Sequence, residues 1–210
     1  MADEENAYSF ATRATRQLTL KNLGEDGFRM RRGGYLPEVT LAYESWGTLS
    51  EAADNAILIF TGLSPSAHAA SSDEDPSPGW WEYMIGPGKA IDTNRFYVVC
   101  ANTLGGCYGS TGPGSVNPET GENYGADFPD VTVEDIASSG YYLMRELGVE
   151  KLHAAVGSSM GGMSSIAYAI QYPHDIEYLV SISAATQALP LTIALRSLQR
   201  EIIRSDPAWN

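Results

Sequence analysis

Residues 156–162 constrain the fold more than any other part of the sequence. They contain the pattern Gly-x-Ser-x-Gly, with Ser159 at its centre. An apolar run at residues 152–156 leads into this pattern, and a run of small and apolar residues at 163–171 follows it. In such a pattern a strand turns sharply into a helix, and small residues flank the serine because neighbouring backbone comes close. The sequence therefore predicts a strand–turn–helix unit with an exposed serine at the turn.

A serine at this turn is suited to nucleophilic catalysis. It lies at the N-terminal end of a helix, where the backbone dipole favours developing negative charge. The alternative is a small-residue turn that has no chemistry. The strand before the turn, the helix after it and the additional glycine at Gly162 favour the nucleophile. Ser159 is therefore the candidate catalytic residue.

A serine nucleophile needs a base within hydrogen-bond reach and an acid that orients the base. In folds with this turn the chain order is serine, then Asp or Glu, then His. His174 follows a predicted helix that rises about 13 Å, which places it at the opposite edge of the sheet. His153 begins the strand before the turn and is expected to be a packed or surface residue. His68 lies in a long loop on the same edge as Ser159, but it precedes the serine in the chain.

Apolar runs that alternate with helical patterns predict an α/β protein with a mostly parallel sheet. Strands with the apolar character of strands buried on both faces are predicted at 56–60, which is apolar throughout, and at 95–100, 152–156 and 178–182. Three further strands are predicted at 16–23, 28–34 and 39–44. Helices are predicted at 133–147, with Thr132 as its cap and Gly148 as its stop, at 163–171 and at 191–204.

Two long irregular segments interrupt this pattern, at residues 62–92 and 102–129. Loops of this length inside a compact domain are usually functional. Each follows the carboxyl end of a predicted buried strand, and ligands bind at that edge of open parallel sheets. We expect both segments to form pocket walls.

Composition narrows the classes of partner. The chain has 26 acidic and 13 basic residues, a net charge of −13, which argues against a nucleic-acid or anionic-membrane surface. No apolar run approaches the roughly 20 residues of a membrane helix, and the acidic N-terminus is no signal peptide. The two cysteines, Cys100 and Cys107, have no zinc-like spacing and are expected to be reduced thiols. We expect a cytoplasmic protein without a metal site.

Longer motifs add a resemblance that covers residues 35 to 210. They are Ala-Tyr-Glu-Ser-Trp-Gly at 42–47, Phe-Thr-Gly-Leu-Ser-Pro-Ser-Ala-His at 60–68, Gly-Trp-Trp at 79–81, the segments at 86–93, 109–113 and 127–129, and Ser-Met-Gly-Gly-Met at 159–163. In this order they resemble the homoserine/serine O-acyltransferase family of the α/β-hydrolase fold. The Gly-Leu-Ser-Pro form, with residues 185–190 and 196–200, is most similar to the serine O-succinyltransferase branch.

The resemblance implies a ping-pong acyl transfer. Ser159 would take the acyl group of an acyl-coenzyme A co-substrate, and the hydroxyl of L-serine or L-homoserine would then accept it. The oxyanion donors would be the backbone N–H of Met160 and that of Phe60 or Thr61. No bound cofactor and no metal is implied, and the full-length enzyme is expected to be a homodimer in cysteine or methionine biosynthesis.

Specificity residues follow by position. Leu63, Ser64 and Pro65 lie where the first long loop leaves its strand and are expected to shape the acceptor pocket. Arg196 is the candidate for acyl-CoA choice, since a guanidinium pairs with the carboxylate of a succinyl group. The alternative for Arg196 is a surface arginine on an amphipathic helix. Succinyl and acetyl donors, and serine and homoserine acceptors, both stay open.

The predicted sheet lacks its C-terminal strands, and the family's downstream Asp, His and substrate-binding Arg have no counterpart here. We therefore expect an N-terminal part of a larger enzyme: a loose arm at 1–15, an α/β-hydrolase core at 16–185 and the start of a helical lid segment at 186–210. Two alternatives remain. One is an esterase or thioesterase, in which water accepts the acyl group, and the other is a non-catalytic truncated product.

Overall fold

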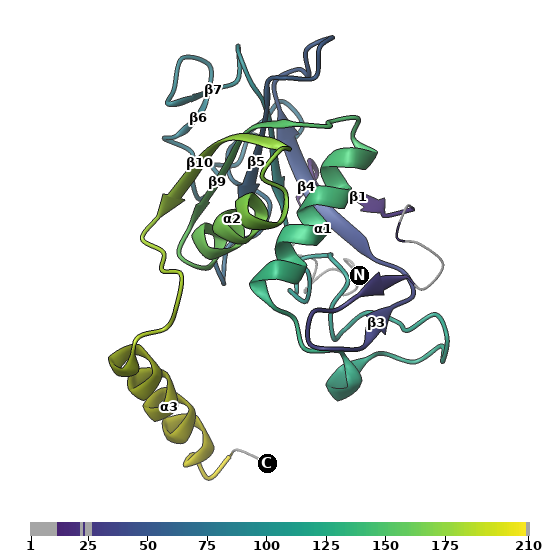
Figure 1. Cartoon of the computed structure of the whole chain (residues 1–210), viewed down its shortest axis with the longest axis vertical. Helices are drawn as coiled ribbons and strands as arrows, with labels where there is room; N and C mark the ends of the chain where they lie inside the picture. The colour runs from purple at the N-terminus through teal and green to yellow at the C-terminus, as the bar shows by residue number, and fades with distance from the viewer. Residues whose placement is uncertain (1–11, 22, 24–26, 209–210) are drawn as a thin grey trace, which may run out of the picture.

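The computed structural model describes residues 12–21, 23 and 27–208. Most of the predicted arm, residues 1–11, and residue 22 of the first predicted strand lie outside this part. A six-stranded sheet forms its centre, and its strands lie in the order β1-β4-β8-β5-β9-β10 (Figure 1). Their bounds are β1 (Arg16–Thr19), β4 (Thr40–Trp46), β8 (Tyr97–Ala101), β5 (Ala56–Phe60), β9 (Leu152–Ser158) and β10 (Ile176–Ile182).

Strand direction divides the sheet into two parts. β1 pairs with β4, and β4 with β8, in antiparallel fashion. β8, β5, β9 and β10 are mutually parallel. Two short pairs lie outside the sheet, β2 (Phe28–Arg29) with β3 (Tyr35–Leu36) and β6 (Ile85–Gly86) with β7 (Ile91–Asp92). The predicted mostly parallel α/β sheet is confirmed, but the predicted strand at 28–34 is only the two residues of β2 followed by a turn.

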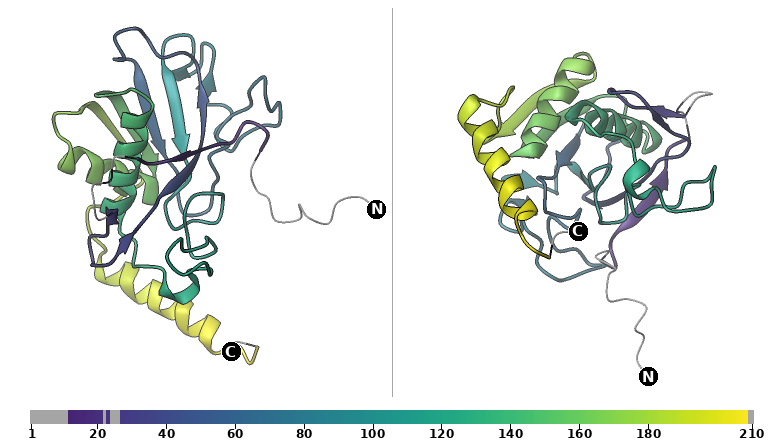
Figure 2. Two further views of the ribbon diagram at one scale, coloured as in Figure 1. Left: turned by 90° about the vertical axis from the view of Figure 1, so that its right-hand side faces the viewer. Right: turned by 90° about the horizontal axis from the view of Figure 1, so that it is seen from below.

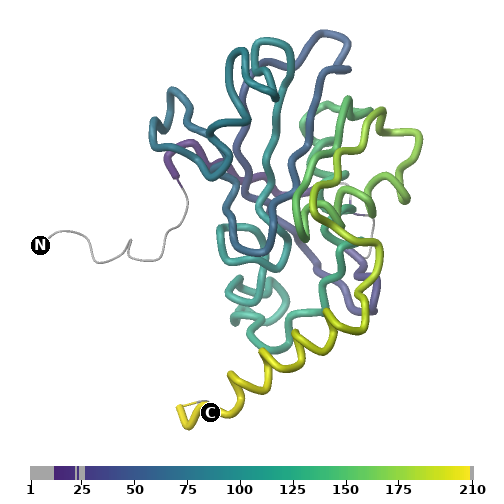
Figure 3. Tube along the Cα trace, turned by 90° about the vertical axis from the view of Figure 1, so that its left-hand side faces the viewer, coloured from purple at the N-terminus to yellow at the C-terminus, as the bar shows by residue number. Residues whose placement is uncertain are grey.

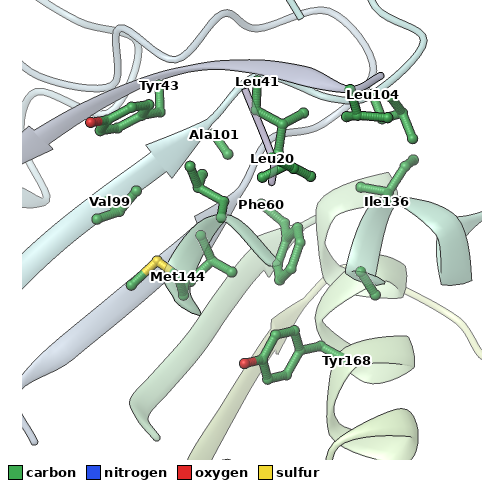
Figure 4. Packing of buried hydrophobic residues seen from close by; sticks show 14 of the residues in the cluster. Leu20, Leu41, Tyr43, Phe60, Val99, Ala101, Leu104, Ile136, Met144 and Tyr168 are labelled. Carbon is green, nitrogen blue, oxygen red and sulfur yellow. The ribbon is translucent and has the colours of Figure 1, made fainter. Parts of the chain in front are cut away.

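Two helices cover one face of the sheet, α1 (Val133–Glu146) and α2 (Met160–Gln171) (Figures 1 and 2). Phe60 of β5 points into the layer between sheet and helices, and its ring lies 6.1 Å from that of Tyr168 on α2 (Figure 4). A Cβ at Gly140 of α1 would lie 2.8 Å from the Phe60 ring. A glycine here therefore lets α1 approach β5 closely. Since α2 begins at Met160, three residues before the predicted start, Ser159 lies directly at the helix end.

The opposite face is covered by the long loop that joins β5 to β8. Trp81, Ile85 and Ile91 of this loop pack on Trp46 and Ile59 of the sheet in a second apolar cluster. The loop is less irregular than its sequence indicated, because it contains β6 and β7. The second long loop also contains a short 3-10 helix, η2 (Gly125–Asp127). Among the described residues, no helix has the length and apolar character required to cross a membrane.

One expectation about burial is wrong. The apolar run at 178–182 predicted a strand buried on both faces, but β10 is the outermost strand and most of its residues are exposed. Tyr178 is 54% and Val180 42% exposed. The apolar side chains of β10 are suited to burial, but β9 is the only strand that flanks β10 in the described residues. α3 (Pro190–Arg204) likewise buries none of its residues and runs clear of the sheet (Figure 3).

The predicted cap of α1 is confirmed. The Thr132 hydroxyl accepts a hydrogen bond from the Asp135 backbone N–H at 3.3 Å, and the Asp135 carboxylate accepts from the Thr132 N–H at 2.8 Å. This reciprocal pair satisfies two N–H groups at the helix start. The second carboxylate oxygen of Asp135 accepts from the Arg31 N–H at 2.8 Å, so the cap also ties the β2–β3 hairpin to α1.

Removing this cap tests the packing of α1. We expect Thr132→Ala to lower the free energy of unfolding by about 1–2 kcal/mol, because an orphan N–H group loses its acceptor. The midpoint of urea unfolding measures the change. Thr192→Ala, on the exposed helix α3, is the control and is expected to stay within about 0.5 kcal/mol of the parent. Equal loss in the two variants would contradict a specific role of the cap.

Candidate active site

Ser159 has the backbone geometry of a strained turn. Its φ of 56° and ψ of −122° lie in a region that residues other than glycine rarely adopt. Such strain costs on the order of 1–3 kcal/mol and persists only where the surroundings enforce it. Ser159 follows β9 directly, precedes the first residue of α2, and is exposed. The predicted strand–turn–helix unit with an exposed serine is therefore present.

Glycines on both sides of Ser159 permit this turn. A Cβ at Gly157 would lie 2.2 Å from the Gly161 carbonyl oxygen. A Cβ at Gly161 would lie 2.0 Å from the carbonyl oxygen of Phe60 and 2.7 Å from that of Thr61. All three distances are far shorter than van der Waals contact. The absence of side chains thus brings the start of α2 directly against the end of β5.

This contact lies at the point where the chain leaves the sheet in two directions. The loop after β5 runs to the face opposite α2, and β8 lies on one side of β5 while β9 lies on the other. Crevices at such switch points bind ligands in open α/β sheets. The backbone N–H of Ser159 donates to the Ile182 carbonyl at 3.0 Å, so β10 fixes the nucleophile from its other side.

The predicted oxyanion donors lie at this junction of β5 and α2. Met160 is the first residue of α2, and the first N–H groups of a helix have no acceptor within it. Thr61 follows the last residue of β5, and its carbonyl, like that of Phe60, borders Gly161. The roles of Met160, Phe60 and Thr61 as oxyanion donors stay predictions, with a placement that suits them.

A residue that sequence reasoning missed fixes the end of β5. The hydroxyl of Thr61, which is 2% exposed, hydrogen-bonds that of Thr103 at 3.0 Å. Thr103 follows β8, so this bond joins the carboxyl ends of two neighbouring strands. Its signal was a threonine within two residues of the end of each of the two strands. The bond restrains the backbone of Thr61 beside the nucleophile.

The part of the chain that the structure describes includes all three histidines, and none hydrogen-bonds the Ser159 hydroxyl. His174 is exposed beyond the far end of α2. His153 stacks on Phe96 and its Nδ1 lies 3.4 Å from a Glu177 carboxylate oxygen. His68 is buried, with both ring nitrogens in hydrogen bonds. His68, the candidate on the same edge as Ser159, is thus held in a structural network instead of facing the nucleophile.

The loop after β5 is fastened by polar contacts. The Glu82 carboxylate accepts from the Ser71 N–H at 2.7 Å, from the Gly79 N–H at 3.2 Å and from Lys89 at 3.2 Å. These donors, the Ser71 N–H foremost, lower the pKa of Glu82 to about 2. A Cβ at Gly79 would lie 2.2 Å from the Ala69 backbone, so the Gly-Trp-Trp motif begins where the loop crosses itself.

The predicted specificity residues fall into two groups, the consecutive residues 63–65 after β5 and Arg196 on α3. Leu63, 80% exposed, and Ser64 are exposed in the loop that follows β5, and Pro65 packs near Gly62. Arg196 lies on α3, where its guanidinium donates to Gln199 at 2.9 Å. No described contact joins Arg196 to Ser159 or to residues 63–65. The roles of all four residues stay predictions.

The cysteines and the Trp80–Trp81 pair are the other side chains considered for a role in the site. Burial raises the pKa of the Cys100 thiol, and Cys107 is an exposed free cysteine. Trp80 and Trp81 stack on each other at 5.2 Å between ring centroids, as packing aromatics do. Among the described residues, no cluster of three His, Cys, Asp or Glu side chains has metal-binding geometry.

Comparison with known proteins gives consistent matches. Residues 55–210 match the family described as the alpha/beta hydrolase fold. The chain is 61% identical over 181 residues to the serine O-succinyltransferase of Litchfieldella anticariensis, covering 86% of this chain and 49% of the relative. It is 54% identical over 184 residues to the L-serine/homoserine O-acetyltransferase of Streptomyces lavendulae, covering 88% and 49%. The crystal structure of esterase E22 superposes with a TM-score of 0.81 at 38% identity, covering 93% of this chain and 55% of that one.

The chain therefore spans about half the length of the curated relatives it matches. The matched half contains the Ser159 turn, the end of β5 and both long loops.

The close approach at Gly161 yields a prediction. We expect Gly161→Ala to lower the free energy of unfolding by about 1–3 kcal/mol or more, because the new methyl group would overlap the Phe60 carbonyl and the backbone must move. Urea unfolding measures the change. Gly114→Ala is the matched control, since a Cβ there meets nothing within 4 Å. A Gly161→Ala protein as stable as the Gly114→Ala protein would show that β5 and α2 are not in this contact.

Proposed function

Because the chain belongs to the alpha/beta hydrolase fold family, we propose that it carries the nucleophile half of an acyl-CoA-dependent O-acyltransferase acting on L-serine or L-homoserine. The family match confirms the fold expected from sequence. The relatives confirm the resemblance to the homoserine/serine O-acyltransferases. The observation that carries the proposal is the strained, exposed Ser159 at the junction of β9, β5 and α2.

The reaction divides into two acyl transfers. Ser159 Oγ attacks the thioester carbonyl and gives its proton to a base. The tetrahedral oxyanion takes hydrogen bonds from the Met160 N–H and from the N–H of Phe60 or Thr61. The carbon–sulfur bond breaks, and the coenzyme A thiolate leaves with a proton. The amino-acid hydroxyl then attacks the acyl-serine and loses its proton to the base, and Ser159 regains a proton as the ester product leaves.

The general base is the part of this reaction that the chain's own histidines do not supply. His68 has both ring nitrogens engaged, and His153 and His174 lie away from Ser159. The relatives are about twice as long as the matched region. We infer that the base and its orienting acid come from residues outside these 210.

The donor and acceptor follow from the same proposal. A relative named for succinyl transfer and one named for acetyl transfer match at 61% and 54% identity, so the donor is succinyl-CoA or acetyl-CoA. Arg196 would pair with a succinyl carboxylate, and Leu63, Ser64 and Pro65 would contact the acceptor. No resident cofactor takes part. We further propose that the enzyme acts in cytoplasmic cysteine or methionine biosynthesis and is a homodimer. The exposed apolar residues of α3 are consistent with association.

Imidazole provides the test, because it can act as the missing base in solution. We expect the 210-residue chain, incubated with succinyl-CoA or acetyl-CoA, to form acyl-Ser159 slowly, and the rate to rise with imidazole concentration near pH 7. Intact-mass spectrometry of the protein and assay of O-acylserine and O-acylhomoserine measure the two steps.

The controls separate the nucleophile from background chemistry. Ser159→Ala is expected to abolish the adduct, whereas Ser158→Ala, which removes the neighbouring hydroxyl, retains it. No Ser159 adduct with either donor at any imidazole concentration would refute the proposal for this chain.

An esterase or thioesterase is the second candidate, and the likeness to esterase E22 at 38% identity favours it. The same nucleophile and oxyanion donors serve either reaction, since only the acceptor differs. Loss of the acyl group from Ser159 at a rate independent of added serine and homoserine would identify the hydrolase. Loss that rises with one amino acid would identify the transferase and its acceptor.

A further inference from the structure

Glu44 is a buried carboxylate in the middle of β4. It is 1% exposed and lies on the same sheet face as Trp46, the face that the loop after β5 covers. A buried carboxylate without donors is strongly destabilising. Glu44 receives three: the hydroxyls of Thr12 and Thr15, the latter at 2.8 Å, and Nδ1 of His68 at 2.9 Å.

His68 makes a second hydrogen bond through its other ring nitrogen. Nε2 lies 2.9 Å from the Ser77 carbonyl oxygen, which can only accept, so Nε2 carries a proton. Nδ1 faces the Glu44 carboxylate, which also accepts, so Nδ1 carries a proton as well. The two contacts together fit the imidazolium form. In this form His68 and Glu44 make a buried ion pair, and beside an ionised Glu44 a neutral ring would lose one of the two bonds.

The same residue organises the segment that leaves β5. The His68 N–H donates to Ser66 Oγ at 3.3 Å, and the His68 carbonyl accepts from the Trp80 N–H at 3.3 Å. The Trp80 indole N–H donates to the Ser66 carbonyl at 2.8 Å. Ser66 and His68 are therefore fixed, and only four residues separate Ser66 from Thr61 at the nucleophile. Thr61 is held at its own side chain by Thr103.

We propose that His68 is a positioning residue whose ion pair with Glu44 holds residues 61–66 in place and so keeps the Thr61 backbone beside Ser159. The inference rests on the proposed function, because it assigns the supported segment to the oxyanion site. His68 does not touch the reacting atoms. It acts through the loop, because the protonated ring hydrogen-bonds both Glu44 on β4 and the Ser77 carbonyl.

The electrostatics of the network agree with this geometry. Burial by itself lowers the pKa of His68, but the hydrogen bond to Glu44, that to the Ser77 carbonyl and the charges of Glu44 and Asp75 outweigh it, and the pKa is raised above its ordinary value. Glu44 faces the ring from β4 and Asp75 from the loop, while Thr12 and Thr15 are uncharged. Because the folded-state pKa is raised, this stabilisation is complete below about pH 6.5 and is lost as the pH rises through the folded pKa.

Nuclear magnetic resonance of the 210-residue chain between pH 6 and 9 tests the proposal without any need for turnover. We expect the His68 ring to titrate above pH 6.5. We expect the amide signals of Thr61 and Ser66 to shift with the same midpoint. Hydrogen-exchange protection at the Trp80 amide should fall as the pH rises through the same midpoint.

Two variants separate positioning from general stability. His68→Gln keeps a hydrogen-bonding side chain but does not titrate, so the Thr61 and Ser66 signals should become independent of pH. His153→Gln is the matched control, because His153 also lies beside a carboxylate, that of Glu177 at 3.4 Å. His153→Gln should leave the pH dependence of the Thr61 amide signal unchanged. Should His68→Gln fail to fold, the titration of the parent protein still decides.

Three results would overturn the inference: a His68 ring that is neutral at pH 6, Thr61 and Ser66 signals that ignore the His68 titration, or signals that follow His153 instead. The imidazole-assisted acylation of Ser159 adds a kinetic readout. His68→Gln should slow it about 10- to 100-fold, as misplacement of a reacting site does, whereas His153→Gln should not. If no variant is acylated, the proposed function fails while the magnetic-resonance titration still tests the positioning role.

Discussion

The contact between the end of β5 and the start of α2 is the constraint on which the candidate site depends. No side-chain atom separates the Gly161 backbone from the carbonyls of Phe60 and Thr61. The nucleophile and its predicted oxyanion donors therefore meet through backbone packing alone. Side-chain contacts can relax when a neighbour changes, but two backbone segments at this distance move only together. The left-handed strain at Ser159 is sustained by the same contact, since the helix start cannot shift away from β5 without opening the core around Phe60.

The two faces of the sheet hold this contact by different means. On the helical face α1 and α2 are regular elements that pack on Phe60 and its apolar neighbours. On the other face a long loop follows Thr61, and polar groups fix it: the Glu82 carboxylate with its several donors, and the pair of Glu44 with His68. Regular helices have their backbone hydrogen bonds internally, whereas a loop needs side chains to supply them. The helical side of the site is thus held by regular secondary structure. The loop side depends on the protonation of the buried His68.

Much of the fold could be predicted from sequence, because apolar periodicity and turn chemistry are local. The strand at 56–60 has the predicted bounds, and the Thr132 cap stands where the sequence placed it. The Ser159 turn was predictable because glycines mark the close approach of backbone. The exposure of β10 was not, since an apolar run carries no information on whether a neighbour flanks it. The roles of Glu44 and Thr103 were missed for a related reason: their partners lie 24 and 42 residues away, and no local pattern joins them.

β10 is an exposed edge strand that is hydrogen-bonded directly to the Ser159 turn. Ile182, the last residue of β10, accepts the hydrogen bond from the Ser159 N–H at 3.0 Å, and this residue is 38% exposed. A strand with one neighbour and half-exposed apolar side chains opens more readily than one inside the sheet. Any change in the packing of β10 therefore reaches the nucleophile directly through this backbone bond. Burial of β10 against another element would restrain the Ser159 backbone directly. The reactivity of Ser159 is therefore linked to whether β10 is buried.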